Sequence, residues 1–323
     1  MALWPHGRAR RQGGRAVAVI AVDCGGTNLV FGVFDESGGG DPAGVRPAPA
    51  RAGAIPEAVV AAISPLLGPE VSAVGIGCAG LVDHVNGRLV WSPHASGPAV
   101  PLGPEVARAT GLPVLVDNDA NLAALAEARL GAGSGGRMVL FVGLGTGIGG
   151  GLVIEGRVER GRGFLGEMGH LVLDPAGPLC ACGRRGCWEA LVSGTSLGRS
   201  ARELAAADPL GAVAHAAGGE VPRGEHLVVA AAAGDGEAAR RLAAAGGWLG
   251  RGLANLVALL DPDVIVVGGA VAGAGEPLLG PARAVLAETV EGGGRRRATP
   301  VVPARFGRTA GLVGAALAVG EAA

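Results

Sequence analysis

The chain contains no lysine and no tyrosine, and aromatic residues make up only 3% of its 323 residues. The missing lysine excludes a Walker-type phosphate loop, in which a lysine contacts the nucleotide phosphates. The balance of 27 basic and 28 acidic residues gives a net charge of -1, so we expect no nucleic-acid partner. No uninterrupted apolar run reaches membrane-spanning length, and the most apolar stretch, 242–260, carries Arg251. We therefore expect a soluble cytoplasmic protein that has no membrane partner.

The five cysteines do not form the pattern of a secreted disulfide framework. Their number is odd, and three of them lie between Cys180 and Cys187. This spacing favours metal binding in a reducing cytoplasm. Residues 1–16 are rich in arginine but lack the apolar segment of a signal peptide. We interpret them as a disordered tail or as the product of an upstream start codon.

A strand, a glycine turn and a second strand occur in each half of the chain. Residues 16–22 form a continuous apolar run that is typical of a buried strand, and a second strand is expected over 29–34, after a glycine turn. A strand over 138–142, the glycine-rich turn Gly143–Gly151 and a strand over 152–154 repeat this arrangement. The other expected elements are a weak strand within 38–54, a helix over 56–67, a strand over 71–76, a strand over 113–116, a helix over 121–130, a glycine-rich boundary over 131–136, a helix over 237–260, a strand over 264–267 and a last helix beginning near 311.

The two glycine turns have the composition of phosphate-binding loops. Backbone N–H groups in such turns can approach phosphate oxygens closely, and a carboxylate at the strand end can lie near Mg²⁺. An ordinary glycine hairpin explains the first turn equally well, but two such turns together favour phosphate binding. The residues concerned are Asp23, Gly25, Gly26 and Thr27 in the first turn and Gly145, Thr146 and Gly147 in the second.

A dinucleotide-binding fold is not expected. The pattern G-x-G-x-x-G occurs at Gly75–Gly80 and at Gly145–Gly150. A dinucleotide site requires this pattern between a strand and a helix, with an acidic residue about 20 positions further on. The first occurrence is followed by a loop and the second by a strand, so neither has the required context.

Asn118 and Asp119 follow a predicted strand, at the edge where an open α/β sheet binds its ligands. A carboxylate there can accept the proton of an attacking hydroxyl group, as phosphoryl transfer to an alcohol requires. Alternatively, Asp117, Asn118 or Asp119 caps the helix that begins near Asn121. Because a cap needs only one of the three residues, both interpretations remain open.

The segment from Glu167 to Glu189 contains a complete set of zinc ligands. His170, Cys180, Cys182 and Cys187 supply one imidazole and three thiolates, the set typical of a closed structural zinc site. Glycines between the cysteines allow a tight turn. The alternative is a group of three unrelated buried cysteines and a surface histidine. Cys24 and Cys78 lie outside this segment, and we expect both to be small buried residues.

These motifs resemble those of the ROK family of bacterial sugar kinases and repressors, and most closely its glucokinases. The H-x9-C-x-C-x4-C spacing followed by a glutamate is the most specific feature. The resemblance extends from about Val17 to Val319 and rests on the segments AVDCGGTN, GIGCAGLVD, LPVLVDNDANLAALAE, GLGTGIGGGLV, GEMGHLVL, CACGRRGCWEALVSG, LDPDVIVVGGAV and GLVGAALAV.

The resemblance implies an α/β fold, the actin-like (RNase H-like) two-domain sugar kinase fold with an interdomain cleft. We expect a small N-terminal α/β domain over 17–118 and a large α/β domain over 119–307, which includes a zinc loop over 167–189. A C-terminal helix over about 308–323 is expected to pack back on the small domain.

The resemblance also implies roles for individual residues. Asp119 matches the position of the catalytic base that deprotonates the sugar 6-hydroxyl. Gly268 and Gly269 match a turn on the nucleotide side, and the two glycine turns match the phosphate motifs. Asn118, Glu167, His170 and Glu189 match positions that hydrogen-bond the sugar hydroxyls. His170 would bind zinc through one ring nitrogen and direct the other toward the sugar.

The expected function is that of an ATP-dependent glucokinase that makes glucose 6-phosphate, with Mg²⁺ as cofactor and zinc as a structural ion. The chain departs from the family at Ala79, where proline is usual, and the loop around His94 lacks a common tryptophan. Sugar identity therefore stays open, with fructose, mannose, allose and N-acetylhexosamine as alternatives. The donor, ATP or polyphosphate, also stays open, and the family suggests a homodimer or homotetramer. A sugar-sensing repressor and a silent sugar-binding protein are further alternatives, although only about sixteen residues precede Val17.

Overall fold

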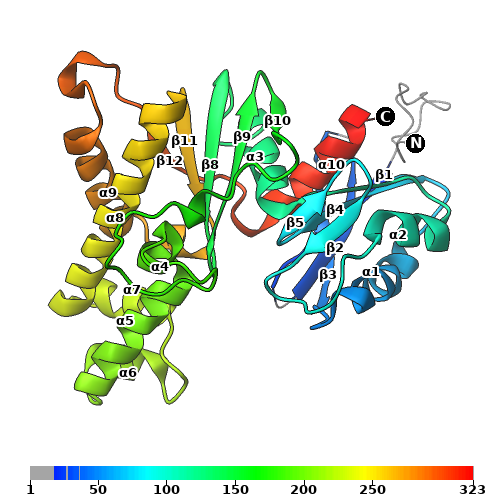
Figure 1. Cartoon of the computed structure of the whole chain (residues 1–323). Helices are drawn as coiled ribbons and strands as arrows, with labels where there is room; N and C mark the ends of the chain where they lie inside the picture. The colour runs from blue at the N-terminus through cyan, green and yellow to red at the C-terminus, as the bar shows by residue number, and fades with distance from the viewer. Residues whose placement is uncertain (1–17, 27, 36, 323) are drawn as a thin grey trace. The chain divides into compact units, whose positions relative to one another are not determined.

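The computed structural model describes residues 18–26, 28–35 and 37–322 (Figure 1). The predicted N-terminal tail and Thr27 lie outside these residues. The described chain divides into two compact units. The first contains residues 18–135, 151–166 and 308–322, and the second contains residues 136–150 and 167–307. The expected domain limits at 118 and 307 stay a prediction, and the glycine-rich segment 131–136 includes one of the observed division points.

The first unit is built on a five-stranded sheet of order β3-β2-β1-β4-β7. β1 (Ala18–Cys24) pairs antiparallel with β2 (Asn28–Asp35), as the hairpin prediction requires, and β2 pairs with β3 (Gly40–Pro47). β1 also pairs in parallel with β4 (Val71–Cys78), which pairs in parallel with β7 (Val114–Asn118). The carboxyl ends of β1, β4 and β7 therefore meet at one edge of this sheet.

Helices cover both faces of the first sheet (Figure 1). Alternate residues of β4 point to opposite faces, so Val74 and Ile76 enter one core, whereas Gly75 faces the other side. A Cβ added at Gly75 would lie 2.6 Å from the carbonyl oxygen of Ala315, so a helix lies directly on the strand there. The helices and short elements of this unit are η1 (Ala52–Ala54), α1 (Ile55–Ile63), η2 (Ser64–Leu66), β5 (Leu81–Asp83), β6 (Arg88–Trp91), α2 (Leu102–Thr110), α3 (Asp119–Arg129) and α10 (Ala310–Ala322).

A second five-stranded sheet has the order β10-β9-β8-β11-β12. β8 (Met138–Leu144) pairs in parallel with β11 (Val264–Gly268), which pairs in parallel with β12 (Val301–Pro303). β9 (Ile148–Ile154) pairs antiparallel with β10 (Arg157–Glu159). The end of β9 and all of β10 belong to the first unit. The strand, glycine turn and strand predicted for this half are therefore β8 and β9.

Helices make up most of the second unit. Its longest helix, α8 (Gly236–Leu260), is long and apolar enough to cross a membrane by length and composition alone. More than half of its most apolar window is buried against other elements, as in the core helix of a globular protein. The other helices are η3 (Met168–His170), α4 (Trp188–Val192), α5 (Gly194–Ala207), α6 (Ala212–Ala217), α7 (Gly224–Ala232), η4 (Ala270–Ala274), α9 (Glu276–Thr289) and η5 (Gly293–Arg295). The short η6 (Gly307–Thr309) begins at the last residue of the second unit and continues into the first.

Glycines on one face of α8 allow α9 to approach closely. A Cβ added at Gly250 would lie 2.4 Å from the carbonyl oxygen of Ala282, whereas one added at Gly247 would meet only Val285 Cγ2 at 3.9 Å. We expect Gly250→Ala to destabilise the protein by about 1–3 kcal/mol, because the two helices must separate. Gly247→Ala should stabilise it by about 0.5–1 kcal/mol, because alanine restricts the unfolded chain and favours the helix. Urea unfolding measures both, and equal effects at the two positions would contradict this packing.

Candidate functional site

At the junction between β7 and α3, one residue caps the helix and the next is the candidate catalytic residue. Asn118 is the N-cap of α3, and its Oδ1 accepts hydrogen bonds from the backbone N–H groups of Ala120 at 2.9 Å and Asn121 at 3.1 Å. Asn118 Nδ2 donates to the carbonyl oxygen of Gly80 at 3.0 Å. Asp119 is therefore not required as the cap. Its Oδ1 accepts from the N–H of Ala120 at 2.9 Å, and burial raises the pKa of its carboxyl group.

Asp23 lies at the carboxyl end of β1, and its carboxyl group is desolvated. Burial, followed by the charge of Asp119, raises the pKa of Asp23 to about 7. Its Oδ1 is buried and has no hydrogen-bond partner among the described residues. A buried carboxylate oxygen of this kind, next to a second carboxylate, fits a hard divalent cation such as Mg²⁺.

The raised pKa of Asp23 predicts a pH-dependent stability. Between about pH 4 and pH 7 the folded carboxyl group keeps a proton that the unfolded chain has lost, so the free energy of unfolding should fall as the pH rises through this window. In the absence of Mg²⁺ and nucleotide, Asp23→Asn should match the unmodified chain near pH 4 and exceed its stability by at most about 4 kcal/mol at pH 8.

Denaturant unfolding at several pH values measures this difference, and parallel stability curves for the two proteins would contradict it. Asp35→Asn serves as a control of opposite sign. The Ser37 hydroxyl donates to the exposed Asp35 carboxylate and holds its pKa below the usual range. Loss of that carboxylate should therefore reduce stability as the pH rises above its pKa.

The first glycine turn follows Asp23 directly. The N–H of Gly25 donates to the carbonyl oxygen of Asn28 at 3.0 Å and closes the turn. The imidazole of His94 lies against Gly26, where an added Cβ would lie 2.8 Å from ring atoms. A side chain at position 26 would displace this ring, so glycine leaves room for His94 in its observed position. The structure thus brings together Asp23, Gly25, Gly26, His94, Asn118 and Asp119 within the first unit.

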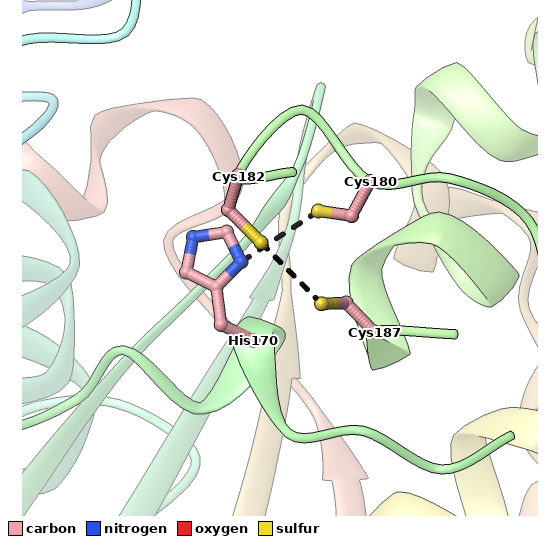
Figure 2. A group of neighbouring side chains, drawn as sticks. All are labelled: His170, Cys180, Cys182 and Cys187. Carbon is pink, nitrogen blue, oxygen red and sulfur yellow. Dashed lines mark hydrogen bonds between the residues drawn. The ribbon is translucent and has the colours of Figure 1, made fainter. Parts of the chain in front are cut away.

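The four predicted zinc ligands converge in the second unit (Figure 2). The candidate ligand atoms of His170, Cys180, Cys182 and Cys187 all lie within 4.8 Å of one another. His170 Nδ1 is 3.7 Å from Cys180 Sγ, and the sulfur atoms of Cys182 and Cys187 are 3.5 Å apart. One imidazole and three thiols at these separations are compatible with a tetrahedral structural zinc ion.

Glycines shape the loop that carries the cysteines. Gly183 and Gly186 have φ angles of +86° and +67°, a left-handed conformation that side chains other than glycine rarely adopt. A Cβ at Gly186 would also overlap the carbonyl oxygen of Asp174. These two positions confirm that a tight turn between the thiols depends on glycine.

The two predicted carboxylates lie beside His170. Glu167 Oε2 is 4.0 Å from His170 Nε2, and Glu189 Oε1 is 4.0 Å from His170 Nδ1. Glu189 Oε2 accepts a hydrogen bond from the backbone N–H of Ile148 at 3.0 Å. Glu189 therefore connects the cysteine cluster to the second glycine turn, a contact that sequence spacing does not indicate.

The second glycine turn and the turn at Gly268 and Gly269 lie together. The N–H of Gly145 donates to the carbonyl oxygen of Gly147 at 3.0 Å. Gly269 has a φ of +84°, and a Cβ there would lie 2.4 Å from the carbonyl oxygen of Leu144, directly before the turn. Both turns therefore lie where the parallel strands β8 and β11 end.

Thr195 also belongs to this region and was not predicted. Its hydroxyl group donates to the carbonyl oxygen of Thr146 at 2.8 Å, and its backbone N–H donates to the same oxygen at 3.2 Å. Ser193 caps α5 by accepting from the N–H of Ser196. The sequence indicates a helix start at Ser193, because serine is a common N-cap residue. It does not indicate the contact of Thr195 with Thr146, which lies 49 positions earlier.

Comparison with known proteins gives consistent results. A model of the ROK family matches residues 19–322. The glucokinase of Streptomyces coelicolor is 40% identical over 303 residues, which covers 92% of the chain and 96% of that protein. The glucokinase of Thermotoga maritima is 37% identical over 273 residues, covering 82% and 86%. A crystal structure of a ROK family glucokinase from Streptomyces griseus in complex with glucose and AMPPNP is similar with a TM-score of 0.84 and 40% identity, and the match covers 93% of the chain and 98% of that structure.

Proposed function

The chain belongs to the ROK family, and from this membership we propose that it is an ATP-dependent glucokinase that transfers the γ-phosphoryl group of ATP to the 6-hydroxyl of glucose. Its fold is the actin-like sugar kinase fold that the family resemblance implied. The observation that carries the proposal is the Asp119 carboxylate. It lies at a strand end and has a raised pKa, and it is not needed as a helix cap because Asn118 caps α3.

Asp119 is the proposed general base. A base must be ionised and must lie where it can accept the proton of the attacking hydroxyl group. Desolvation makes its carboxylate a stronger base than an exposed aspartate, because burial disfavours the charged form. The 6-hydroxyl would lose its proton to Asp119 as its oxygen attacks the γ-phosphorus atom.

The glycine turns are the proposed phosphate contacts. Gly25 and Gly26, with Thr27, would serve in the first unit, and Gly145, Thr146 and Gly147 in the second. Gly268 and Gly269 would form the turn that contacts the nucleotide. Because lysine is absent, backbone amides, arginine and a bound metal must carry the phosphate charge. Asp23 would hold Mg²⁺, which neutralises charge on the transferring group when bound.

The proposed sugar contacts are Asn118, Glu167, His170 and Glu189. Asn118 uses its Oδ1 and one N–H in the protein, so its second N–H is available to a hydroxyl group. Glu189 Oε2 accepts from the N–H of Ile148, whereas Oε1 accepts from the Cys180 thiol at 3.4 Å and faces His170. A structural zinc ion on Cys180, Cys182, Cys187 and His170 would fix the orientation of the histidine ring.

The experiment that tests the function is an activity panel of sugars against donors. Glucose with ATP should give the highest kcat/KM in a coupled ADP assay. Higher kcat/KM with fructose, mannose, allose or an N-acetylhexosamine would change the sugar, and higher activity with polyphosphate would change the donor. If no pair of sugar and donor gives turnover, the protein would be a sugar-binding protein and not a kinase.

The buried thiols favour a cytoplasmic location, and a homodimer or homotetramer is the proposed assembly.

A further inference from the structure

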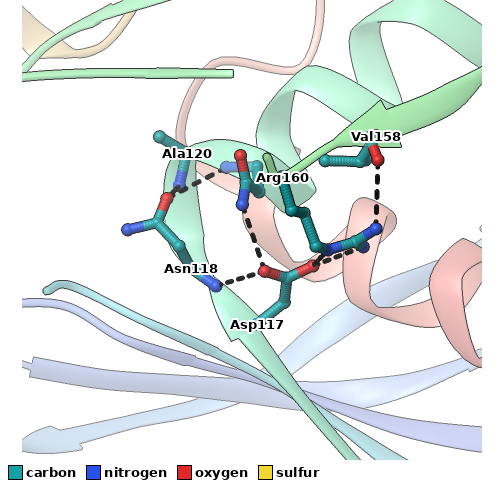
Figure 3. Close-up of polar contacts among 6 residues, drawn as sticks. Asp117, Asn118, Ala120, Val158 and Arg160 are labelled. Carbon is teal, nitrogen blue, oxygen red and sulfur yellow. Dashed lines mark hydrogen bonds and ion pairs between the residues drawn. The ribbon is translucent and has the colours of Figure 1, made fainter. Parts of the chain in front are cut away.

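Asp117 is a buried carboxylate directly before the proposed sugar contact Asn118 and the proposed base Asp119. Its exposed fraction is only 2%, and it lies at the end of β7, in the first unit. Its Oδ1 accepts a hydrogen bond from the backbone N–H of Asn118 at 2.8 Å (Figure 3). The same oxygen accepts from Asn121 Nδ2 at 3.1 Å. One oxygen therefore holds both the residue before Asp119 and the first turn of α3.

Arg160 occupies the other oxygen of Asp117. Its Nε and Nη2 both donate to Asp117 Oδ2, at 2.9 Å and 2.6 Å (Figure 3). Arg160 Nη1 also donates to the carbonyl oxygen of Val158 at 3.1 Å, which fixes the guanidinium plane. A planar guanidinium that donates two hydrogen bonds orients a carboxylate in a way that a lysine ammonium cannot.

The carboxylate of the pair is costly to bury, and only its arginine is partly exposed to solvent. The Asp117 side chain is 3% exposed, whereas the Arg160 side chain is 24% exposed. Replacing a buried ion pair with apolar residues is often neutral for stability, so stability alone does not explain why the chain carries this one. Its hydrogen bonds instead end on the backbone and side chain that flank Asp119.

We infer that Asp117 and Arg160 are positioning residues that hold the β7–α3 turn so that the Asp119 carboxylate keeps its catalytic orientation. The inference rests on the proposed function, because it assigns the pair to the reaction that Asp119 performs. Catalysis is sensitive to small displacements, and a shift of about 1 Å can reduce turnover about 100-fold. The pair should therefore affect kcat more than glucose binding.

The test compares Arg160→Lys with Arg157→Lys. Arg157 lies three positions earlier on β10 and is exposed, so it receives the same chemical change outside the pair. Arg160→Lys keeps the charge beside Asp117 but removes the two guanidinium hydrogen bonds that converge on Asp117 Oδ2. We expect its kcat to fall about 10- to 100-fold, with the glucose Kd and the thermal unfolding midpoint close to those of Arg157→Lys. Arg160→Ala should recover part of its kcat when guanidinium ion is added at concentrations that do not unfold the protein.

Three outcomes would overturn the inference. The first is an unchanged kcat in Arg160→Lys while the unmodified chain phosphorylates glucose. The second is a fall in kcat, glucose affinity and folded fraction to the same extent, because this result would mean that the pair only stabilises the fold. The third is an Arg160→Ala protein that folds but shows no recovery with guanidinium. If the unmodified chain itself has no kinase activity, the proposed function fails, and this result is separate from all three.

Discussion

Asp119→Asn is expected to lower kcat for glucose phosphorylation by about 10²- to 10⁴-fold, the usual contribution of a general base. An amide has nearly the same shape as a carboxylate and can still accept the N–H of Ala120 through its oxygen. It cannot accept the proton of the sugar hydroxyl. Glucose binding should change little, because the proposed sugar contacts Asn118, Glu167, His170 and Glu189 remain.

A coupled ADP assay measures kcat, and calorimetric titration measures glucose affinity in the same preparation. Asp208→Asn provides a matched control, because it makes the same change at an exposed aspartate after α5 and should leave both quantities unchanged. A near-normal kcat in Asp119→Asn would remove Asp119 from the role of base. It would also remove the main argument for the kinase.

Removal of zinc with a chelator is expected to reduce stability and glucose affinity together. Binding of a ligand to the folded state adds about 4 kcal/mol when its concentration is about 1,000 times its Kd, so a tightly held ion accounts for a loss of this size. Glucose affinity should fall because His170 loses the ligand bond that fixes its ring, and the position of that ring beside Glu189 is then no longer held.

Cys187→Ser should reproduce the effect of the chelator without any chelator present. Cys187 is fully buried in the cluster, so its replacement removes one of the three thiolates. Cys24→Ser is the control, because Cys24 lies in the other unit and that protein should still respond to chelation. Metal analysis, thermal unfolding and glucose titration give the three measurements. A chelated protein that has lost its zinc but keeps both stability and glucose affinity would show that the cluster has no such role.

Local sequence patterns predicted the parts of the fold that depend on neighbouring residues. The apolar run before Asp23 and the glycines after it were sufficient for the β1–β2 hairpin. The four metal-binding side chains lie within a short segment, so spacing alone identified the cluster. The predicted start of α3 near Asn121 was two residues late, because Asn118 caps the helix. The helix α2 was not predicted, since its first turn contains both a glycine and a proline.

Long-range contacts could not be predicted from one sequence. Arg160 reaches Asp117 across 43 positions, and Glu189 reaches Ile148 across 41. Neither pair has a characteristic spacing, because the separation depends on which strands become neighbours. Asp117 was recognised only as one of three possible caps. Its ion pair became evident when β7 and the segment after β10 were placed side by side in the first unit.

The Glu189 carboxylate has a consequence for how two ligands influence each other. One of its oxygens holds the N–H of Ile148 at the second glycine turn, and the other faces the histidine of the cysteine cluster. A nucleotide that orders this turn and a metal ion that orders the cluster therefore restrict the same side chain. Thermodynamic linkage requires the effect to be reciprocal, so if zinc tightens nucleotide binding by some factor, the nucleotide must tighten zinc binding by the same factor. Slower loss of zinc in the presence of nucleotide would be the visible sign of this coupling.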